Sequence, residues 1–174
     1  SADDMQFASA QFPQVYEVST NGGRPVMFSS MPMEDIQFNP TGNAILFHDK
    51  KGYECPWRKH HTSSITRDIW MCTLDGARTY QKMSPFNGED RNPVWANADT
   101  YYYLSEQGGT FNVFKANIKG GNPVQITKHV KHPVRFLSRA NNGTLCYGYD
   151  GGIYTLKEGN QPQKVDIQIV TDKI

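Results

Sequence analysis

The sequence predicts an all-β fold, and three of its features support that class. A four-part pattern recurs at a period of about 40 residues, no stretch keeps a 3.6-residue apolar period, and Gly and Pro recur at nearly every predicted turn. Four short strands per repeat at this period are typical of one blade of a β-propeller. The prediction is therefore a partial β-propeller of about four blades, each of four antiparallel strands.

Three stretches carry the pattern, at residues 34–84, 93–127 and 133–167. The first piece of each ends on an aromatic residue and runs into a turn rich in Asn and Gly, which tolerate the positive φ of hairpin turns. The second piece is aromatic and β-branched, and the third has an aromatic residue near its start. The first-piece aromatics are Phe38, Trp95 and Phe136, and the third-piece aromatics are Trp70, Phe114 and Tyr154.

The N-terminal part fits the same pattern, because Gly22–Phe28 mirrors Gly120–Ile126 and Tyr16 takes the third-piece position. Residues 1–31 are therefore expected to supply the later strands of a blade whose innermost strand is missing or lies upstream. Within a single unit of residues 1–174, the predicted blades are 1–31 (partial), 32–84, 85–127 and 128–170.

Cys146 is predicted to be core. Aromatics predicted to pack in or between blades are Trp70, Trp95, Tyr101, Tyr103, Phe114, Phe136 and Tyr154.

Charge and composition argue against several classes of partner. Eighteen Lys and Arg oppose seventeen Asp and Glu, for a net charge of +1, and no block of like charge is long enough to steer a polyanion such as nucleic acid. The apolar runs fall far short of the roughly 20 residues of a membrane-spanning helix. The three cysteines form no C-x-x-C pair, so neither a disulfide framework nor a zinc site is predicted.

An incomplete propeller leaves blade faces without neighbours. Propellers close with roughly 4 to 8 blades, whereas this chain offers three whole repeats and part of a fourth. An open arc exposes apolar surface and strand edges. Two copies are therefore expected to pack face to face, or the chain to aggregate.

A long insertion, residues 50–67, interrupts the hairpin of the second blade and concentrates basic side chains beside a tryptophan. Arg pairs well with a carboxylate, an aromatic ring offers an apolar wall, and loops on a rigid scaffold often bind ligands. The insertion is predicted to anchor peptides; the competing interpretation is that it caps a neighbouring domain or braces adjacent blades. The predicted binding residues are Trp57, Arg58, Lys59, His60, His61 and Arg67.

Neither catalysis nor metal binding is predicted. Serine, histidine and aspartate lie close together in the insertion, yet the sequence has no G-x-S-x-G elbow and no oxyanion loop to orient them. His129 and His132 could face one direction but lack an evident third ligand. The expectation is no catalytic residue, no metal and no cofactor.

Three charged residues, Glu89, Asp90 and Arg91, precede an inner strand. They are expected to form a salt bridge or turn brace where blades meet.

Several segments resemble the N-terminal propeller of bacterial tricorn-type serine peptidases. The inserted WRKHHTSS (57–64), running into TRDIW (66–70), carries the most specific likeness, and GEDRNPV (88–94), HPVRFL (132–137) and NGTLCYGYD (142–150) extend it. The resemblance covers essentially the whole chain, which looks like the C-terminal portion of that propeller. The blades of this portion are similar to those of TolB.

The resemblance implies a non-catalytic segment that guides or filters peptide or unfolded-protein substrates toward a protease domain. Members of the family couple such propellers to a PDZ domain and a serine peptidase domain, so the implied partners are the remaining blades and those two domains. No position matches the family's nucleophile. The alternative is a TolB-like module that binds a protein in the cell envelope; a propeller enzyme with a central metal is a third possibility. Bacterial relatives are often exported, which implies a periplasmic location.

Overall fold

The computed structural model describes residues 12–52, 63–168 and 170. All the regular secondary structure in these ranges consists of β-strands. The all-β prediction is therefore confirmed. Among the described residues, no helix has the length and apolar character needed to cross a membrane.

The strands form four antiparallel sheets, each built from strands that follow one another in the chain. Sheet I contains β1 (Val15–Glu17) and β2 (Val26–Ser29). Sheet II contains β3 (Met33–Phe38), β4 (Ala44–Asp49), β5 (Ile69–Thr73) and β6 (Tyr80–Lys82). Sheet III contains β7 (Asp90–Trp95), β8 (Thr100–Ser105), β9 (Asn112–Asn117) and β10 (Val124–Gln125). Sheet IV contains β11 (Arg135–Arg139), β12 (Leu145–Tyr149), β13 (Gly152–Leu156) and β14 (Gln163–Lys164).

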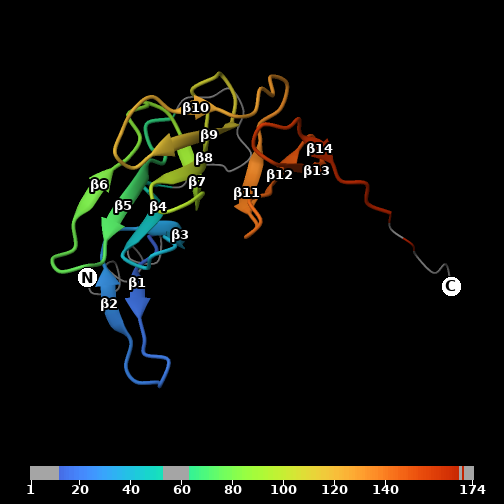
Figure 1. Cartoon of the computed structure of the whole chain (residues 1–174). Coiled ribbons are helices and arrows are strands. Elements are labelled where there is room, and N and C mark those ends of the chain that lie inside the picture. The colour runs from blue at the N-terminus through green and yellow to red at the C-terminus, as the bar shows by residue number, and fades with distance from the viewer. Residues whose placement is uncertain (1–11, 53–62, 169, 171–174) are drawn as a thin grey trace.

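The four sheets follow one another around an arc (Figure 1). The first strand of each four-stranded sheet lies beside the first strand of the next, since β3 contacts β7 and β7 contacts β11. The first strands therefore stand nearest a common axis, and the remaining strands extend outward from it. This radial arrangement is that of propeller blades and confirms the predicted partial β-propeller.

The third-piece aromatics take the same place in every four-stranded sheet. Each lies on the third strand and is paired with an aromatic residue on the second, in the pairs Phe47 with Trp70, Tyr103 with Phe114 and Tyr147 with Tyr154. Cross-strand aromatic pairs of this kind stabilise a sheet and add bulk to one face. The repeat in the sequence is therefore a repeat of strand register.

The apolar core lies in layers between successive sheets. Sheets I and II enclose Met33, Ile45, Phe47 and Cys72, with Val15 and Phe28 packed against them. Sheets II and III enclose Leu46, Ile69, Trp95, Tyr101, Tyr103 and Phe114. Sheets III and IV enclose Val94, Tyr102, Leu104, Phe111, Val113, Val134, Leu137, Leu145, Tyr147 and Leu156. Sheets II and III thus bury both of their faces. This confirms the packing between blades that was predicted for most of the aromatic residues.

The prediction for Phe136 is wrong, because its side chain is 65% exposed. Pairing with the second strands shows that the equivalent first-strand positions are Phe38 opposite Ile45, Trp95 opposite Tyr101 and Arg139 opposite Leu145. Phe136 instead corresponds to Asp35 and Asn92. All three have positive φ, at 57°, 52° and 51°, where the strand pairing shifts register. Phe136 lies three residues before Arg139, which holds the position equivalent to Phe38 and Trp95. Aligning the repeats on their aromatic residues therefore assigned Phe136 to the wrong position of its strand.

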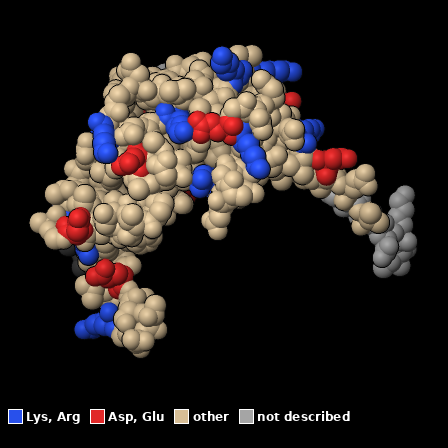
Figure 2. Space-filling view, viewed as in Figure 1, with Lys and Arg blue, Asp and Glu red and all other residues tan. Residues whose placement is uncertain are grey.

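Acidic and basic side chains are interspersed over the face seen in Figure 2. Several of them link neighbouring sheets: Arg78, in the β5–β6 turn, lies 3.5 Å from Glu17 of sheet I, and Lys115 of sheet III lies 2.8 Å from Glu158, which follows β13 of sheet IV. The surface therefore carries local ion pairs between sheets rather than a field of one sign.

Candidate functional site

The predicted peptide-anchoring residues fall mainly in the 53–62 segment. Trp57, Arg58, Lys59, His60 and His61 lie outside the described residues. The described parts of the β4–β5 connection, residues 50–52 and 63–68, contain the two ends of the insertion. Arg67 is in this part, and its surroundings define the base of the insertion.

Arg67 joins sheet II to the segment that leads into sheet III. Its Nη1 lies 3.1 Å from Oε1 of Glu89, and its Nε lies 3.5 Å from Oε2 of Glu34 at the start of β3. The Arg67 side chain is 11% exposed and that of Glu89 is fully buried. Arg91 also approaches Glu89, at 3.4 Å. The salt bridge expected around Glu89 and Arg91 is confirmed. Arg67 adds a second ion pair to Glu89, from the connection that precedes β5 of sheet II.

Glu34 and His48 form the second part of this network. Nε2 of His48 lies 3.4 Å from Oε2 of Glu34, and Lys50 Nζ lies 2.9 Å from Oε1 of the same carboxylate. The contact with His48, opposed by burial and aided by Lys50, lowers the pKa of Glu34 to about 2. The backbone N–H of Asn92 on β7 donates to Nδ1 of His48, which leaves Nε2 to carry the proton that faces Glu34. His48 therefore ties β4 to the first strand of the next sheet.

The two ends of the insertion are also clasped to each other. Lys51 Nζ lies 2.5 Å from Oδ2 of Asp68 and donates to the carbonyl oxygen of Thr66 at 2.8 Å. Asp49 Oδ1 accepts the backbone N–H of Asp68 at 2.8 Å, and Asp49 Oδ2 accepts the Trp70 indole N–H at 3.2 Å. These contacts close the insertion at its base, so the β4–β5 ladder continues in register beneath it.

The clasped base lies at the end of the propeller axis. Glu34 stands at the start of β3 and Glu89 directly precedes β7, and these first strands are the ones nearest the axis (Figure 1). We call this set the rim network and define it as Glu34, His48, Lys50, Lys51, Arg67, Asp68, Glu89 and Arg91. It holds the described ends of the insertion to each other and to the first strands of sheets II and III.

Outside the rim network, the two histidines of the 127–133 connection both lie near the ring of Tyr149 but differ in their polar partners. The His129 ring stacks on Tyr149 with a centroid separation of 3.8 Å, and its Nε2 lies 3.1 Å from the Tyr147 hydroxyl. Burial lowers the pKa of His129 and raises that of Tyr147 to about 12. His132 instead lies 3.1 Å from Asp150. Within the described ranges, no three His, Cys, Asp or Glu side chains come together as a metal site would require.

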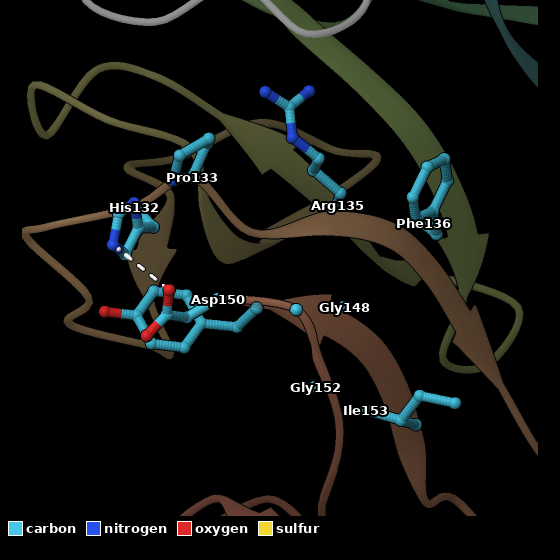
Figure 3. Close-up of a pocket in the computed structure, with 10 residues that line it drawn as sticks. His132, Pro133, Arg135, Phe136, Gly148, Asp150, Gly152 and Ile153 are labelled. Carbon is cyan, nitrogen blue, oxygen red and sulfur yellow. Dashed lines mark ion pairs between the residues drawn. The ribbon is translucent and has the colours of Figure 1, made fainter.

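A hollow lies on the outer face of sheet IV and was not foreseen from the sequence. Figure 3 shows Phe136 and Ile153 on its two sides, with Gly148 between them and the His132–Asp150 pair at one end. Its volume is about 560 Å³. We call it the end-face hollow. Correct matching of Phe136 with Asp35 and Asn92 would have indicated an exposed aromatic residue here.

Sheets arranged radially around an axis, with a clasped insertion at one end of it, define the chain as a segment of a β-propeller. The family model for the tricorn protease N-terminal beta propeller domain matches residues 2–162. The chain therefore belongs to the tricorn protease N-terminal β-propeller family, as the resemblance in its motifs predicted.

Solved structures share the fold at low sequence identity. The tricorn protease is 18% identical with a TM-score of 0.72, covering 94% of this chain and 15% of that one. The putative TolB from Agrobacterium tumefaciens is 14% identical with a TM-score of 0.70, covering 88% and 56%. TolB from Acinetobacter baumannii is 13% identical with a TM-score of 0.59, covering 87% and 40%. The chain thus spans little more than half, or less, of these proteins. No curated protein matches it.

Proposed function

We propose that the chain is a non-catalytic propeller segment of a tricorn-type serine peptidase, which guides or filters peptides toward a protease domain elsewhere in the protein. Membership of the tricorn N-terminal propeller family supports this setting. In the proposal, Trp57, Arg58, Lys59, His60 and His61 contact the peptide. Arg67 is held between two glutamates and positions the segment that carries them.

The observation that carries the proposal is the rim network. A loop that selects peptides must keep a fixed position relative to the channel they enter, because an ordered site loses less entropy on binding. Lys51 bonded to Thr66 and Asp68 closes the loop, and Arg67 fastens it to Glu34 on β3 and to Glu89, which directly precedes β7. The basic residues between these ends suit the C-terminal carboxylate of a peptide.

Removing the basic pair in the complete enzyme tests the proposal. The Arg58→Ala/Lys59→Ala double variant should lower kcat/KM about tenfold or more for peptides with a free C-terminal carboxylate, which is the loss expected for a charge-assisted contact of about 1.5 kcal/mol. The same peptides with an amidated C-terminus should be cleaved equally by both enzymes. Arg24→Ala/Lys119→Ala, which removes exposed cations in two other turns, is the matched control. Unchanged kinetics with the free-acid peptides would refute the anchoring role.

The second candidate is a TolB-like module that binds a protein partner in the periplasm, and the likeness to two TolB structures favours it. The complete open reading frame separates the two candidates. A PDZ domain followed by a serine peptidase domain supports the first, and a stop codon after the propeller supports the second. Fractionation of cells expressing the full-length protein tests the periplasmic location. Pairing of two copies through open faces stays a prediction for sedimentation at high concentration.

A further inference from the structure

At one end of each junction between four-stranded sheets, strand pairing identifies four equivalent positions. Two belong to the earlier sheet and pair across its second and third strands; the other two belong to the later sheet, at the end of its first strand and just after its third strand. Between sheets II and III, the four positions hold members of one apolar cluster, Leu46, Met71, Trp95 and Ile118. Between sheets III and IV, they hold polar residues, Tyr102, Lys115, Arg139 and Glu158. The junction of sheets III and IV therefore departs from the repeat.

These polar residues line a groove at the junction. Its volume is about 340 Å³, and the other residues that line it are Ala96, Asn97, Asn142, Gly143 and Lys157. We call the polar four and these residues together the junction groove. Arg139 is the last residue of β11 and Ala96 follows the last residue of β7, whereas Glu89 of the rim network precedes the first residue of β7. The junction groove therefore lies at the opposite end of the first strands from the rim network.

One half of the groove already binds a carboxylate of this chain. Lys115 Nζ donates to both carboxylate oxygens of Glu158 at 2.8 Å, and the Tyr102 hydroxyl donates to Oε2 at 2.5 Å. Tyr102 is only 4% exposed, so its hydroxyl reaches the groove from the core. The hydrogen bonds from Lys115 and Tyr102 lower the pKa of Glu158. This half of the groove therefore stabilises an ionised carboxylate.

The other half contains two cations, Arg139 and Lys157. Arg139 lies against Gly143, since a Cβ added to that glycine would lie 3.6 Å from Arg139 Nη2. Burial and the contact with Glu158 raise the pKa of Tyr102, and the charge of Arg139 opposes this rise, as expected for a guanidinium that faces the same groove. Within residues 12–52, 63–168 and 170, no carboxylate lies within ion-pair distance of Arg139 or Lys157.

Two asparagines add neutral donors to this half. Asn97 Oδ1 accepts the backbone N–H groups of Asp99 and Thr100, each at 2.9 Å, and Asn142 Oδ1 accepts that of Thr144 at 3.0 Å. Because both side-chain oxygens are used within their own turns, the amide nitrogens are what Asn97 and Asn142 have left to offer a ligand. The second half of the groove is therefore rich in donors and poor in acceptors.

We propose that the junction groove binds a small oxyanion, whose phosphate or carboxylate group is held by Arg139 and Lys157 beside the Tyr102–Glu158 pair. Three cations, Lys115, Arg139 and Lys157, face the single carboxylate of Glu158, so an anion is the ligand that balances the charge. A guanidinium binds phosphate and carboxylate groups through paired N–H donors. The ligand is small because the groove is small and the chain, at a net charge of +1, has no wider basic field to attract a polyanion.

Equilibrium dialysis of the full chain against radiolabelled inorganic phosphate, at pH 8 and low ionic strength, tests the site. Wild type should bind phosphate saturably. Arg139→Gln and Lys157→Gln should each raise the Kd about tenfold, which is the loss expected for one charge-assisted contact. Arg24→Gln, which removes an exposed cation from the β1–β2 turn, is the matched control and should leave the Kd unchanged. The urea midpoint of each variant checks that the fold is retained, and the exposed Lys157 provides a variant that does not depend on the packing of Arg139.

Glu158→Gln gives a result of the opposite sign. It removes the carboxylate that repels an incoming anion and frees Lys115 to bind it, so phosphate should bind several-fold more tightly than to wild type, with the gain shrinking as salt is added. Radiolabelled succinate in place of phosphate distinguishes the two sources of oxyanion. Binding of phosphate alone assigns a phosphate compound, and equal or tighter binding of succinate assigns a carboxylate compound; either result supports the site.

Three results would overturn the proposal. One is the lack of saturable binding of both phosphate and succinate to wild type. Another is an unchanged Kd in Arg139→Gln and Lys157→Gln, which would place the bound anion elsewhere on the chain. The third is weaker binding to Glu158→Gln, which would show that the Glu158 carboxylate supports the ligand instead of competing with it. None of these results bears on the peptide-turnover test, so failure of the two proposals can be told apart.

Discussion

Asp90 is a carboxylic acid at a position that other sheets fill with an apolar residue. It lies opposite Ser105 at the start of β7, as Met33 lies opposite Asp49 at the start of β3. Its side chain is fully buried and accepts a hydrogen bond from the Ser84 hydroxyl. Burial, with the nearby Asp68 and Glu106 carboxylates, raises its pKa to about 7, although Ser105 and Lys82 act in the opposite direction.

The raised pKa makes stability depend on pH with a definite sign. Between the usual pKa of 3.8 and the folded value of about 7, the folded chain holds a proton that the unfolded chain has lost. The free energy of unfolding contributed by this group is therefore complete below pH 3.8 and falls as pH rises toward 7, by about 4 kcal/mol in total. Asp90→Asn keeps the shape of the protonated acid and removes this loss.

Urea unfolding of both proteins, followed by tryptophan fluorescence from pH 4 to 8, measures the difference. The stability of Asp90→Asn should be close to that of the wild type at pH 4 and should exceed it by up to about 4 kcal/mol at pH 8. Taking the difference cancels titrations common to both chains. Asp99→Asn, which removes a carboxylate that is 54% exposed, is the matched control. Parallel pH profiles for wild type and Asp90→Asn would refute the buried neutral acid.

Two further substitutions test the ion pairs between sheets. Arg67→Met keeps the aliphatic stem but removes a charged partner of the fully buried Glu89, so it should lower the free energy of unfolding by about 3 kcal/mol; an unchanged urea midpoint would contradict the brace. Glu158→Gln weakens the contact with Lys115 across the junction of sheets III and IV. Since Glu158 is 47% exposed, the cost should stay below about 1 kcal/mol and vanish at high salt; a large, salt-independent loss would show a different role.

Strand order was predictable because each repeat carries its own local signals. Gly22 and Gly23 adopt the positive φ that Gly120 and Gly121 adopt in the matching turn, which confirms the alignment of the N-terminal hairpin with a later one. Short strands separated by such turns pair with their sequence neighbours, so local signals were sufficient to indicate the order within a sheet.

Contacts between sheets were harder to predict, because they join residues with no shared local pattern. The charge of Glu89 and Arg91 indicated a salt bridge, yet nothing nearby in the sequence names Arg67 as its partner. Similarly, the sequence shows an aromatic residue at the start of β11 but does not show which strand position it takes. Only the pairing with β12 shows that Phe136 occupies the position with positive φ and not the position equivalent to Trp95.

The insertion can differ in sequence without disturbing the blade that carries it. The β4–β5 ladder keeps Phe47 opposite Trp70 and His48 opposite Ile69 directly below the clasped base. Lengthening a loop whose ends are already held together adds little closure entropy, since each doubling of length costs only about 0.6 kcal/mol. Substitutions within residues 53–62 should therefore change what this rim binds at small cost to stability. Under the proposed function, this separation would let one propeller scaffold serve different peptides.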